Sequence, residues 1–150
     1  MNMKNWKYSW KSVTDKDYID SIMIFWKFFK ENYQNVFVYN ACHYEIRLIT
    51  LNIGRGKEIL SSEAASKSTQ KDEHHLVEAK QFLDEFKYCV DNKIEFTRKD
   101  AKSWLIKARN IYVTKPEHNI LHSKVFKDYR KNNPTENIIK VLEKFGIILI

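Results

Sequence analysis

DKDYIDSIMIFWKFFKENY, residues 15–33, carries a wide and heavily aromatic apolar stripe. Its large apolar side chains recur at spacings of three and four residues, which places them on one face of an α-helix. Thr14 precedes the stretch, and Asp17 stands where a capping box has its acidic partner. We therefore predict a helix over 15–33 that supplies much of the core. The residues of its buried face are Tyr18, Ile22, Phe25, Trp26, Phe29 and Tyr33.

The segments on both sides of this helix have the composition of strands. Residues 36–39 and 43–53 are rich in β-branched and aromatic side chains, and 43–53 begins with alternating apolar and charged positions. We expect these two segments to pair as a hairpin around Asn40 and Ala41. Residues 4–13 alternate loosely and predict a short edge strand.

The second half of the chain is predicted to be mostly helical. Residues 61–71, SSEAASKSTQK, are small, polar and aperiodic, which is typical of a linker. Thr97 with Asp100, and Thr114 with Glu117, have the spacing of capping boxes that begin helices. The expected helices are 69–92, 98–110, 116–131 and 134–145, and the expected strands are 94–96 and 147–150.

Length and composition favour long regular elements around a sizeable core. The chain has 150 residues, is 43% hydrophobic, and contains 3 glycines and 2 prolines. Few helix breakers and ample apolar material argue against a disordered protein. We predict an α+β fold in which an N-terminal helix packs on a small antiparallel sheet. The predicted parts are an α/β subdomain (1–60), the linker (61–71) and a helical subdomain (72–150).

Cysteine content and hydropathy argue against secretion and against a membrane partner. Cys42 and Cys89 are too few for a disulfide framework, so we expect buried free thiols in a reducing compartment. The most apolar stretch, 22–29, contains Lys27 and is far shorter than a membrane span. The start of the chain has no signal-peptide pattern. We therefore expect a cytoplasmic protein.

The net charge of the chain is concentrated in residues 98–131. This window holds ten lysine or arginine residues and three acidic ones, a balance of +7, which equals the formal net charge of the whole chain. Aromatic residues, among them Trp104 and Tyr129, are interleaved with the cations. A localised basic surface with flat side chains is typical of a protein that binds a polyanion, most often nucleic acid.

Helical spacing arranges these cations in two ridges. Arg98 and Lys102 are one turn apart on the first predicted helix, and Lys124, Lys127 and Lys131 follow one face of the next. Lysine suits phosphate contacts, whereas arginine can stack on bases or contact them bidentately. The alternative is a solvated lysine-rich face. The predicted nucleic-acid-binding residues are Arg98, Lys99, Lys102, Lys107, Arg109, Lys124, Lys127, Arg130 and Lys131.

Two segments of the second half resemble a winged-helix domain. IEFTRKDA, residues 94–101, has the pattern of a short strand that leads into a capped helix. ENIIKVLEKFGIILI, residues 136–150, has the pattern of a helix that Gly146 ends before an apolar strand. The resemblance covers residues 69–150. It implies that the two strands pair and that the last helix enters the major groove of DNA.

His118 and His122 are four residues apart on one predicted helix, a spacing at which two imidazoles can bind one Zn²⁺. No glutamate follows His118 directly, and no Cys-x-x-Cys pair accompanies the two histidines, so the common zinc patterns are absent. Only the fold could bring Cys42, Cys89 or His74 to them. We interpret both histidines as structural or surface residues and predict neither a metal nor another cofactor.

Gly54-Arg55-Gly56-Lys57 follows the predicted strand 43–53. Backbone N–H groups in such a turn can hold a phosphate. The turn is also slightly similar to the one by which GNAT-type acetyltransferases hold coenzyme A. The simpler interpretation is a turn that ends the strand. No residue spacing in the chain assigns a catalytic residue, so an enzyme is not favoured.

These observations predict a non-catalytic protein that binds nucleic acid, DNA rather than RNA. Its role would be that of a regulator or of an accessory factor for replication or a mobile element such as a phage. The alternative is an adaptor or inhibitor, of the immunity or counter-defence type, whose basic face docks on an acidic protein. A GNAT-like acyltransferase is the third candidate. The sequence leaves the oligomeric state open.

Overall fold

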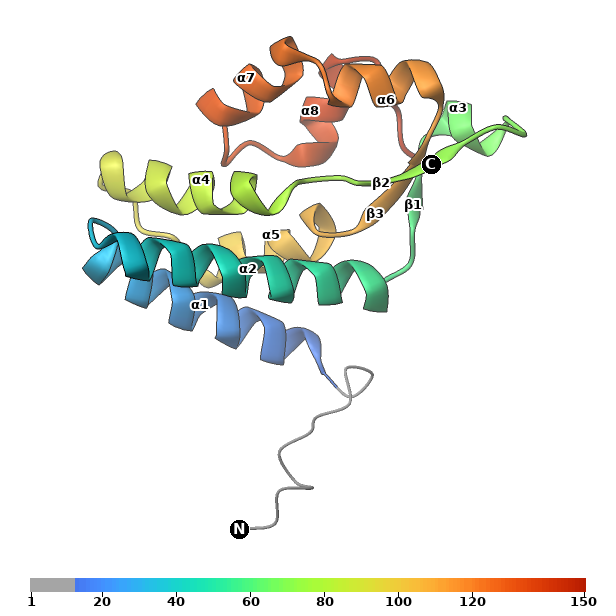
Figure 1. Cartoon of the computed structure of the whole chain (residues 1–150). Helices are drawn as coiled ribbons and strands as arrows, with labels where there is room; N and C mark the ends of the chain where they lie inside the picture. Colours follow the sequence, from blue (N-terminus) through green and yellow to red (C-terminus); the bar gives the residue numbers. More distant parts are fainter. Residues whose placement is uncertain (1–12) are drawn as a thin grey trace.

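The computed structural model describes residues 13–150 and shows a mostly helical protein with one small sheet (Figure 1). The α+β class is thereby confirmed, whereas the predicted strand at 4–13 lies outside the described residues except for Val13. The helices are α1 (Asp15–Asn32), α2 (Val36–Gly56), α3 (Glu63–Ser66), α4 (Ala79–Asp91), α5 (Arg98–Lys107), α6 (Lys115–Leu121), α7 (Lys124–Asn132) and α8 (Ile138–Lys144). The strands are β1 (Leu60–Ser61), β2 (Asp72–His75) and β3 (Asn110–Val113).

The sheet is mixed, with β3 at its centre. β3 runs parallel to β1 and antiparallel to β2, and it pairs with β2 along the whole length of both strands. The strands follow the first two helices in the chain, so the predicted packing of an N-terminal helix on an antiparallel sheet is not found within residues 13–60. Each strand pairs with a segment far away in the sequence, which local patterns do not reveal.

Helix α1 forms where the sequence predicts it. The Thr14 hydroxyl accepts a hydrogen bond from the backbone N–H of Asp17, and the Asp17 carboxylate accepts one of 2.9 Å from the backbone N–H of Thr14. Ile22, Trp26 and Phe29 lie on its buried face, as predicted. α1 packs against α2, α4 and α5 rather than on a sheet (Figure 1).

The predicted hairpin over 36–53 is instead part of the long helix α2. Asn35 begins this helix, because its side-chain oxygen accepts hydrogen bonds from two backbone N–H groups of the first turn. Ile46 is fully buried, whereas Tyr44 and Leu48 are exposed. In a strand these three side chains would share one face, but in a helix positions 44 and 48 lie opposite position 46. Ile46 therefore lies on the buried face of an amphipathic helix, and Tyr44 and Leu48 lie on its exposed face.

A dense aromatic cluster fills the core where α1, α4 and α5 meet. The ring of Trp104 is fully buried, and its centroid lies 5.0 Å from that of Phe86 and 5.4 Å from that of Phe96. The Trp26 ring lies 5.4 Å from Phe86 and 5.5 Å from Phe96. Tilted and edge-on rings at these distances add specific attraction to the burial of apolar area. The predicted apolar faces of α1, α4 and α5 thus form one core.

The second half departs from the prediction at its shorter elements. β2 replaces the beginning of the expected helix 69–92, and only α4 is helical there. In the described chain, residues 94–96 form no strand, and the expected strand 147–150 is reduced to a single bridge between Ser62 and Leu149. The two strands whose pairing the winged-helix resemblance implies are therefore not paired. The resemblance itself stays a prediction.

The expected helices 98–110 and 116–131 are both shorter than predicted. α5 begins at the predicted capping box and ends before strand β3. No strand was predicted at the position of β3. The second helix is divided at His122 into α6 and α7. Ser123 begins α7, because its hydroxyl accepts a hydrogen bond from the backbone N–H of Phe126. α6 therefore ends next to His122, the second of the two histidines that are four residues apart.

The first part of the predicted linker 61–71 is structured as the end of β1 and as helix α3, whereas residues 66, 67 and 69–71 are exposed. Ser62 is fully buried and begins the short helix α3, in which Ala65 is also fully buried. Apolar residues from both sides of this segment belong to one core cluster. The segment therefore leads from β1 to β2 within a packed structure.

Two predictions from composition concern cysteines and membranes. Cys42 and Cys89 are buried free thiols, as expected, and burial raises the pKa of Cys89 to about 12. Among the helices of residues 13–150, none is both long and apolar enough to cross a membrane.

Candidate functional site

Strand β2 places different side chains on the two faces of the sheet. Successive residues of a strand point to opposite sides, so Asp72 and His74 share one face and Glu73 and His75 share the other. Antiparallel pairing with β3 holds the strand and sets His74 opposite Ile111. β2 thus presents one histidine on each side of the sheet.

Helix α6 packs against β2 on the side that carries His74. α6 begins at Thr114, which forms the predicted capping box with Glu117. Glu117 is buried, and its carboxylate also accepts a hydrogen bond of 2.5 Å from the Ser62 hydroxyl. These bonds anchor the start of α6 and determine which of its faces points toward β2.

His74, His118 and His122 come together between β2 and α6. The ring centroid of His74 lies 3.8 Å from that of His118 and 5.5 Å from that of His122, and the latter two are 4.5 Å apart. One ring nitrogen from each residue lies within 4.8 Å of those of the other two. Within residues 13–150 this is the one group of three or more histidine, cysteine or acidic side chains placed closely enough to hold a metal ion. We call these three residues the histidine cluster.

The three imidazoles have different surroundings. His74 and His118 are half-buried, and His122 is exposed. Burial, and after it the neighbouring His118 and His122, lowers the pKa of His74 below its ordinary value. The Nε2 atom of His74 is buried and has no hydrogen-bond partner in the described structure. On the other side of the cluster, the Asp72 carboxylate lies 3.6 Å from Nδ1 of His118.

The sequence named His74, beside Cys42 and Cys89, only as a residue that the fold could bring to His118 and His122, and it did not predict their meeting. A helix over 69–92 gives His74 no defined position relative to His118. The strand pairing provides that position, because β3 pairs with β2 and leads directly into α6. Residues 72–75 are all polar and show no local pattern of a strand, and no local pattern indicates their pairing with β3.

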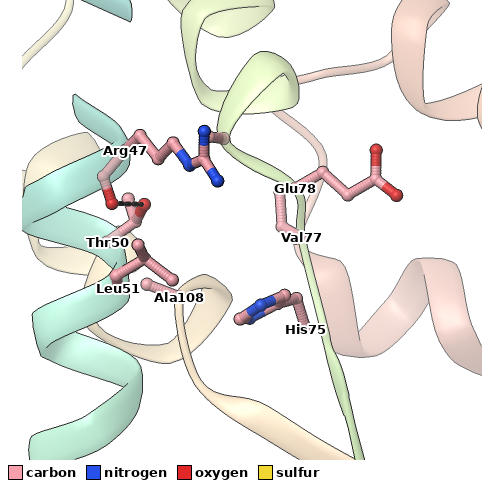
Figure 2. A pocket seen from close by; sticks show the side chains of 8 residues that line it. Arg47, Thr50, Leu51, His75, Val77, Glu78 and Ala108 are labelled. Carbon is pink, nitrogen blue, oxygen red and sulfur yellow. Dashed lines mark hydrogen bonds between the residues drawn. The ribbon is translucent and has the colours of Figure 1, made fainter. Parts of the chain in front are cut away.

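A small pocket lies on the opposite face of β2, between this strand and α2 (Figure 2). Its volume is about 150 Å³, and the side chains of Arg47 and His75 extend toward it from the two elements. His75 Nδ1 lies 3.0 Å from Oδ1 of Asn110, and the Asn110 amide donates a hydrogen bond of 2.9 Å to Glu73. His75 is therefore held on the side of the sheet away from the histidine cluster.

Two of the predicted nucleic-acid-binding residues are buried, and this corrects the prediction for them. The Lys107 ammonium forms an ion pair of 2.5 Å with Glu85 and donates to the backbone carbonyl of Pro134 at 3.4 Å. The guanidinium of Arg130 donates to the backbone carbonyl of Glu136 at 3.2 Å. The sequence analysis counted both cations as part of the basic surface, but neighbouring elements cover them.

The other seven predicted residues lie at least partly at the surface. Arg98 pairs with Asp20 at 2.8 Å, and Lys124 pairs with Asp128 one turn along α7, so their charges are partly compensated. Arg109 is half-buried. Among the predicted residues, the exposed lysines that form no ion pair within the described part of the chain are Lys99, Lys102, Lys127 and Lys131.

The two predicted basic ridges do not form one surface. α5 packs against α1, whereas α7 packs against α4 and α6, and Figure 1 shows α5 and α7 on opposite sides of α4. The α7 ridge instead continues onto α4. Burial raises the pKa of Asp84 on α4, and Lys80 and Lys87 of α4 and Lys131 of α7 lie near enough to oppose that shift.

The Gly54-Arg55-Gly56 segment forms the last turn of α2 and does not follow a strand. The free carbonyl groups at the C-terminus of a helix carry partial negative charge and disfavour a phosphate. The alternative of a phosphate-binding turn needs free backbone N–H groups at this place, and the preferred interpretation, a turn that ends a strand, is wrong as well. The structural basis for the comparison with the acetyltransferase turn is therefore wrong.

Comparisons of the chain with protein-family models, with curated proteins and with solved structures find no match. The interpretation of the basic residues and of the histidine cluster therefore depends on their geometry.

Proposed function

We propose that the protein binds nucleic acid through a basic surface on α7 and the adjoining side of α4. The observation that carries this proposal is that three exposed lysines, Lys80 and Lys87 of α4 and Lys131 of α7, lie near enough to Asp84 to affect its pKa. Phe126 anchors α7 in the core. A folded surface holds these charges at fixed spacings, unlike a flexible tail. We call this set of residues the α7 surface: Lys80, Lys87, Lys124, Lys127 and Lys131.

The chemistry of the α7 surface favours phosphate contacts over base recognition. Lysine ammonium groups are flexible point charges that neutralise phosphates and release counterions. Base edges are most often read by exposed arginine forks, but the guanidinium of Arg130 is buried. We therefore expect binding with little sequence preference and a steep dependence on salt. Duplex DNA is the first probe.

The position of α5 provides a matched control for this proposal. Lys99 and Lys102 are exposed, form no ion pair within the described residues and belong to the basic window predicted from the sequence. They lie on a helix that packs on the other side of α4. Reversing two charges on α5 therefore changes the net charge as much as reversing two charges on α7.

Fluorescence anisotropy of a labelled duplex at low salt tests the proposal. The Lys127→Glu/Lys131→Glu variant should bind at least about tenfold more weakly, because two phosphate contacts become repulsive. The Lys99→Glu/Lys102→Glu variant should lose much less affinity. The logarithm of the wild-type affinity should fall linearly with the logarithm of the salt concentration.

Two outcomes contradict the proposal: no retention of DNA or RNA at low salt, or an equal loss of affinity in the two double variants. The acidic protein partner considered from the sequence would instead give a stoichiometric complex that survives nuclease treatment. That result would also reject the nucleic-acid proposal.

A further inference from the structure

We propose that His74, His118 and His122 bind a zinc ion. The three residues come from β2 and from the face of α6 that packs on it, and one ring nitrogen from each lies within 4.8 Å of the others. Two of these histidines are one helical turn apart, and the third reaches them only through the sheet. The histidine cluster therefore takes its nitrogen donors from two elements, β2 and α6.

The spacing of the donors suits a single small cation. Zinc binds imidazole nitrogen at about 2.0–2.1 Å, so donors at ideal tetrahedral positions are about 3.4 Å apart. The observed donor atoms all lie within 4.8 Å of one another. Side-chain rotations that move each ring nitrogen by roughly 1 Å would bring them to the tetrahedral spacing. His122 is exposed at the C-terminal end of α6 and has room for such a rotation.

His74 offers an independent indication that a ligand belongs here. Its Nε2 atom is buried and lacks a hydrogen-bond partner in the described structure. A buried polar nitrogen without a partner is costly, and most such atoms in proteins are satisfied. A metal ion in contact with this lone pair would satisfy it.

Asp72 lies where an outer partner of a zinc-binding histidine is usually found. Its carboxylate is 3.6 Å from Nδ1 of His118 and on the same face of β2 as His74. A carboxylate there favours the proton on Nδ1 and so leaves the lone pair on Nε2 for the metal. We assign Asp72 as a positioning residue rather than a ligand.

The type of ligand selects the class of metal. Imidazole nitrogen suits zinc and neighbouring transition ions, whereas magnesium and calcium prefer oxygen ligands. Three histidines leave one position of a tetrahedral zinc site unfilled. Because His122 is exposed, water can occupy that position. The inference goes beyond the proposed function and does not depend on it, since the lysines of the α7 surface are not among these ligands.

Zinc binding should be measured on untagged protein after treatment with a chelator. Isothermal titration, together with competition against a chromophoric chelator, should give one zinc ion per chain. Zinc at a concentration of a hundred times Kd should raise Tm by about 5–10 °C. Magnesium at the same concentration should change nothing. Cobalt should give the visible absorption of a tetrahedral nitrogen site.

His75 is the matched control, because it is on the same strand but points to the opposite face. His74→Ala and His122→Ala should each weaken zinc binding by more than about 100-fold, beyond the usual effect of an outer partner. Asp72→Asn should weaken it about tenfold. His75→Ala should bind zinc like the wild type. Since His122 is exposed, its substitution tests the ligand role even if His74→Ala fails to fold.

The proposal is wrong if zinc produces neither heat nor a rise in Tm with the folded wild-type protein. It is also wrong if His75→Ala weakens binding as much as His122→Ala, or if cobalt bound to the wild type shows no tetrahedral absorption. Loss of DNA binding with zinc binding intact would reject only the proposed function. The opposite result would reject only the zinc site.

Discussion

The ammonium group of Lys107 lies 2.5 Å from the carboxylate of Glu85 inside the protein, where both side chains are almost fully covered. The second oxygen of Glu85 accepts a hydrogen bond of 2.9 Å from Nε1 of Trp104. Burial raises the pKa of Glu85, and Lys107 and Trp104 oppose that shift by stabilising the charged form. This pair joins α4 to α5 within the aromatic core and removes one cation from the predicted basic surface.

Removal of Lys107 alone should be strongly destabilising. Lys107→Met leaves the Glu85 carboxylate buried without its partner, and we expect the free energy of unfolding to fall by about 3–5 kcal/mol. Urea unfolding measures this change. Lys102→Met, at an exposed position of the same helix, should stay within about 0.5 kcal/mol of the wild type. Equal effects at the two positions would contradict the buried ion pair.

The histidine cluster should make the stability of the zinc-free protein depend on pH. The pKa of His74 lies below its ordinary value of 6.5 in the folded state, so the unfolded state binds more protons as the solution becomes acidic. The free energy of unfolding should therefore fall as the pH drops below about 6.5. Urea titrations with a chelator present, over about pH 5–7, should show a smaller slope for His74→Asn. A slope for His74→Asn equal to that of the wild type would contradict the role of His74.

Gly54 is required by a close approach of two backbones. A Cβ atom at this position would lie 2.8 Å from the carbonyl oxygen of Ala108 and 3.2 Å from Oδ1 of Asn110. Gly54→Ala should lower the free energy of unfolding by about 1–3 kcal/mol, because the connection between α5 and β3 has to move. Gly56→Ala meets only the Tyr18 hydroxyl, at 4.0 Å, and should be neutral or slightly stabilising. Thermal unfolding of the two variants compares them, and equal stability would contradict the packing.

Ser62 should contribute to stability although it belongs to the segment predicted as a linker. Its hydroxyl donates to the buried carboxylate of Glu117 at 2.5 Å and accepts from the backbone N–H of Ala65 at 3.0 Å. Ser62→Ala should therefore lower the free energy of unfolding by about 1–3 kcal/mol. Ser66→Ala, at an exposed position of α3, should have a much smaller effect. A free linker would give two equal and negligible changes in urea unfolding.

Local sequence was sufficient for the elements whose signals lie within one helical turn. Thr14 with Asp17 and Thr114 with Glu117 begin α1 and α6 as predicted, because a capping box needs only residues three positions apart. The buried stripe of α1 was also predictable, since its apolar spacing spans the whole helix. The charge balance of residues 98–131 was likewise a property of composition.

Only the tertiary structure decided how these pieces meet. Ile46 could be assigned to a strand or to a helix until α2 packed against α1 and α4. Burial of Lys107 depended on α4 lying beside α5, and the meeting of His74 with His118 depended on the pairing of β2 with β3. Contacts between residues far apart in sequence carry no local signal, because their free energy is gained only when the whole chain is packed.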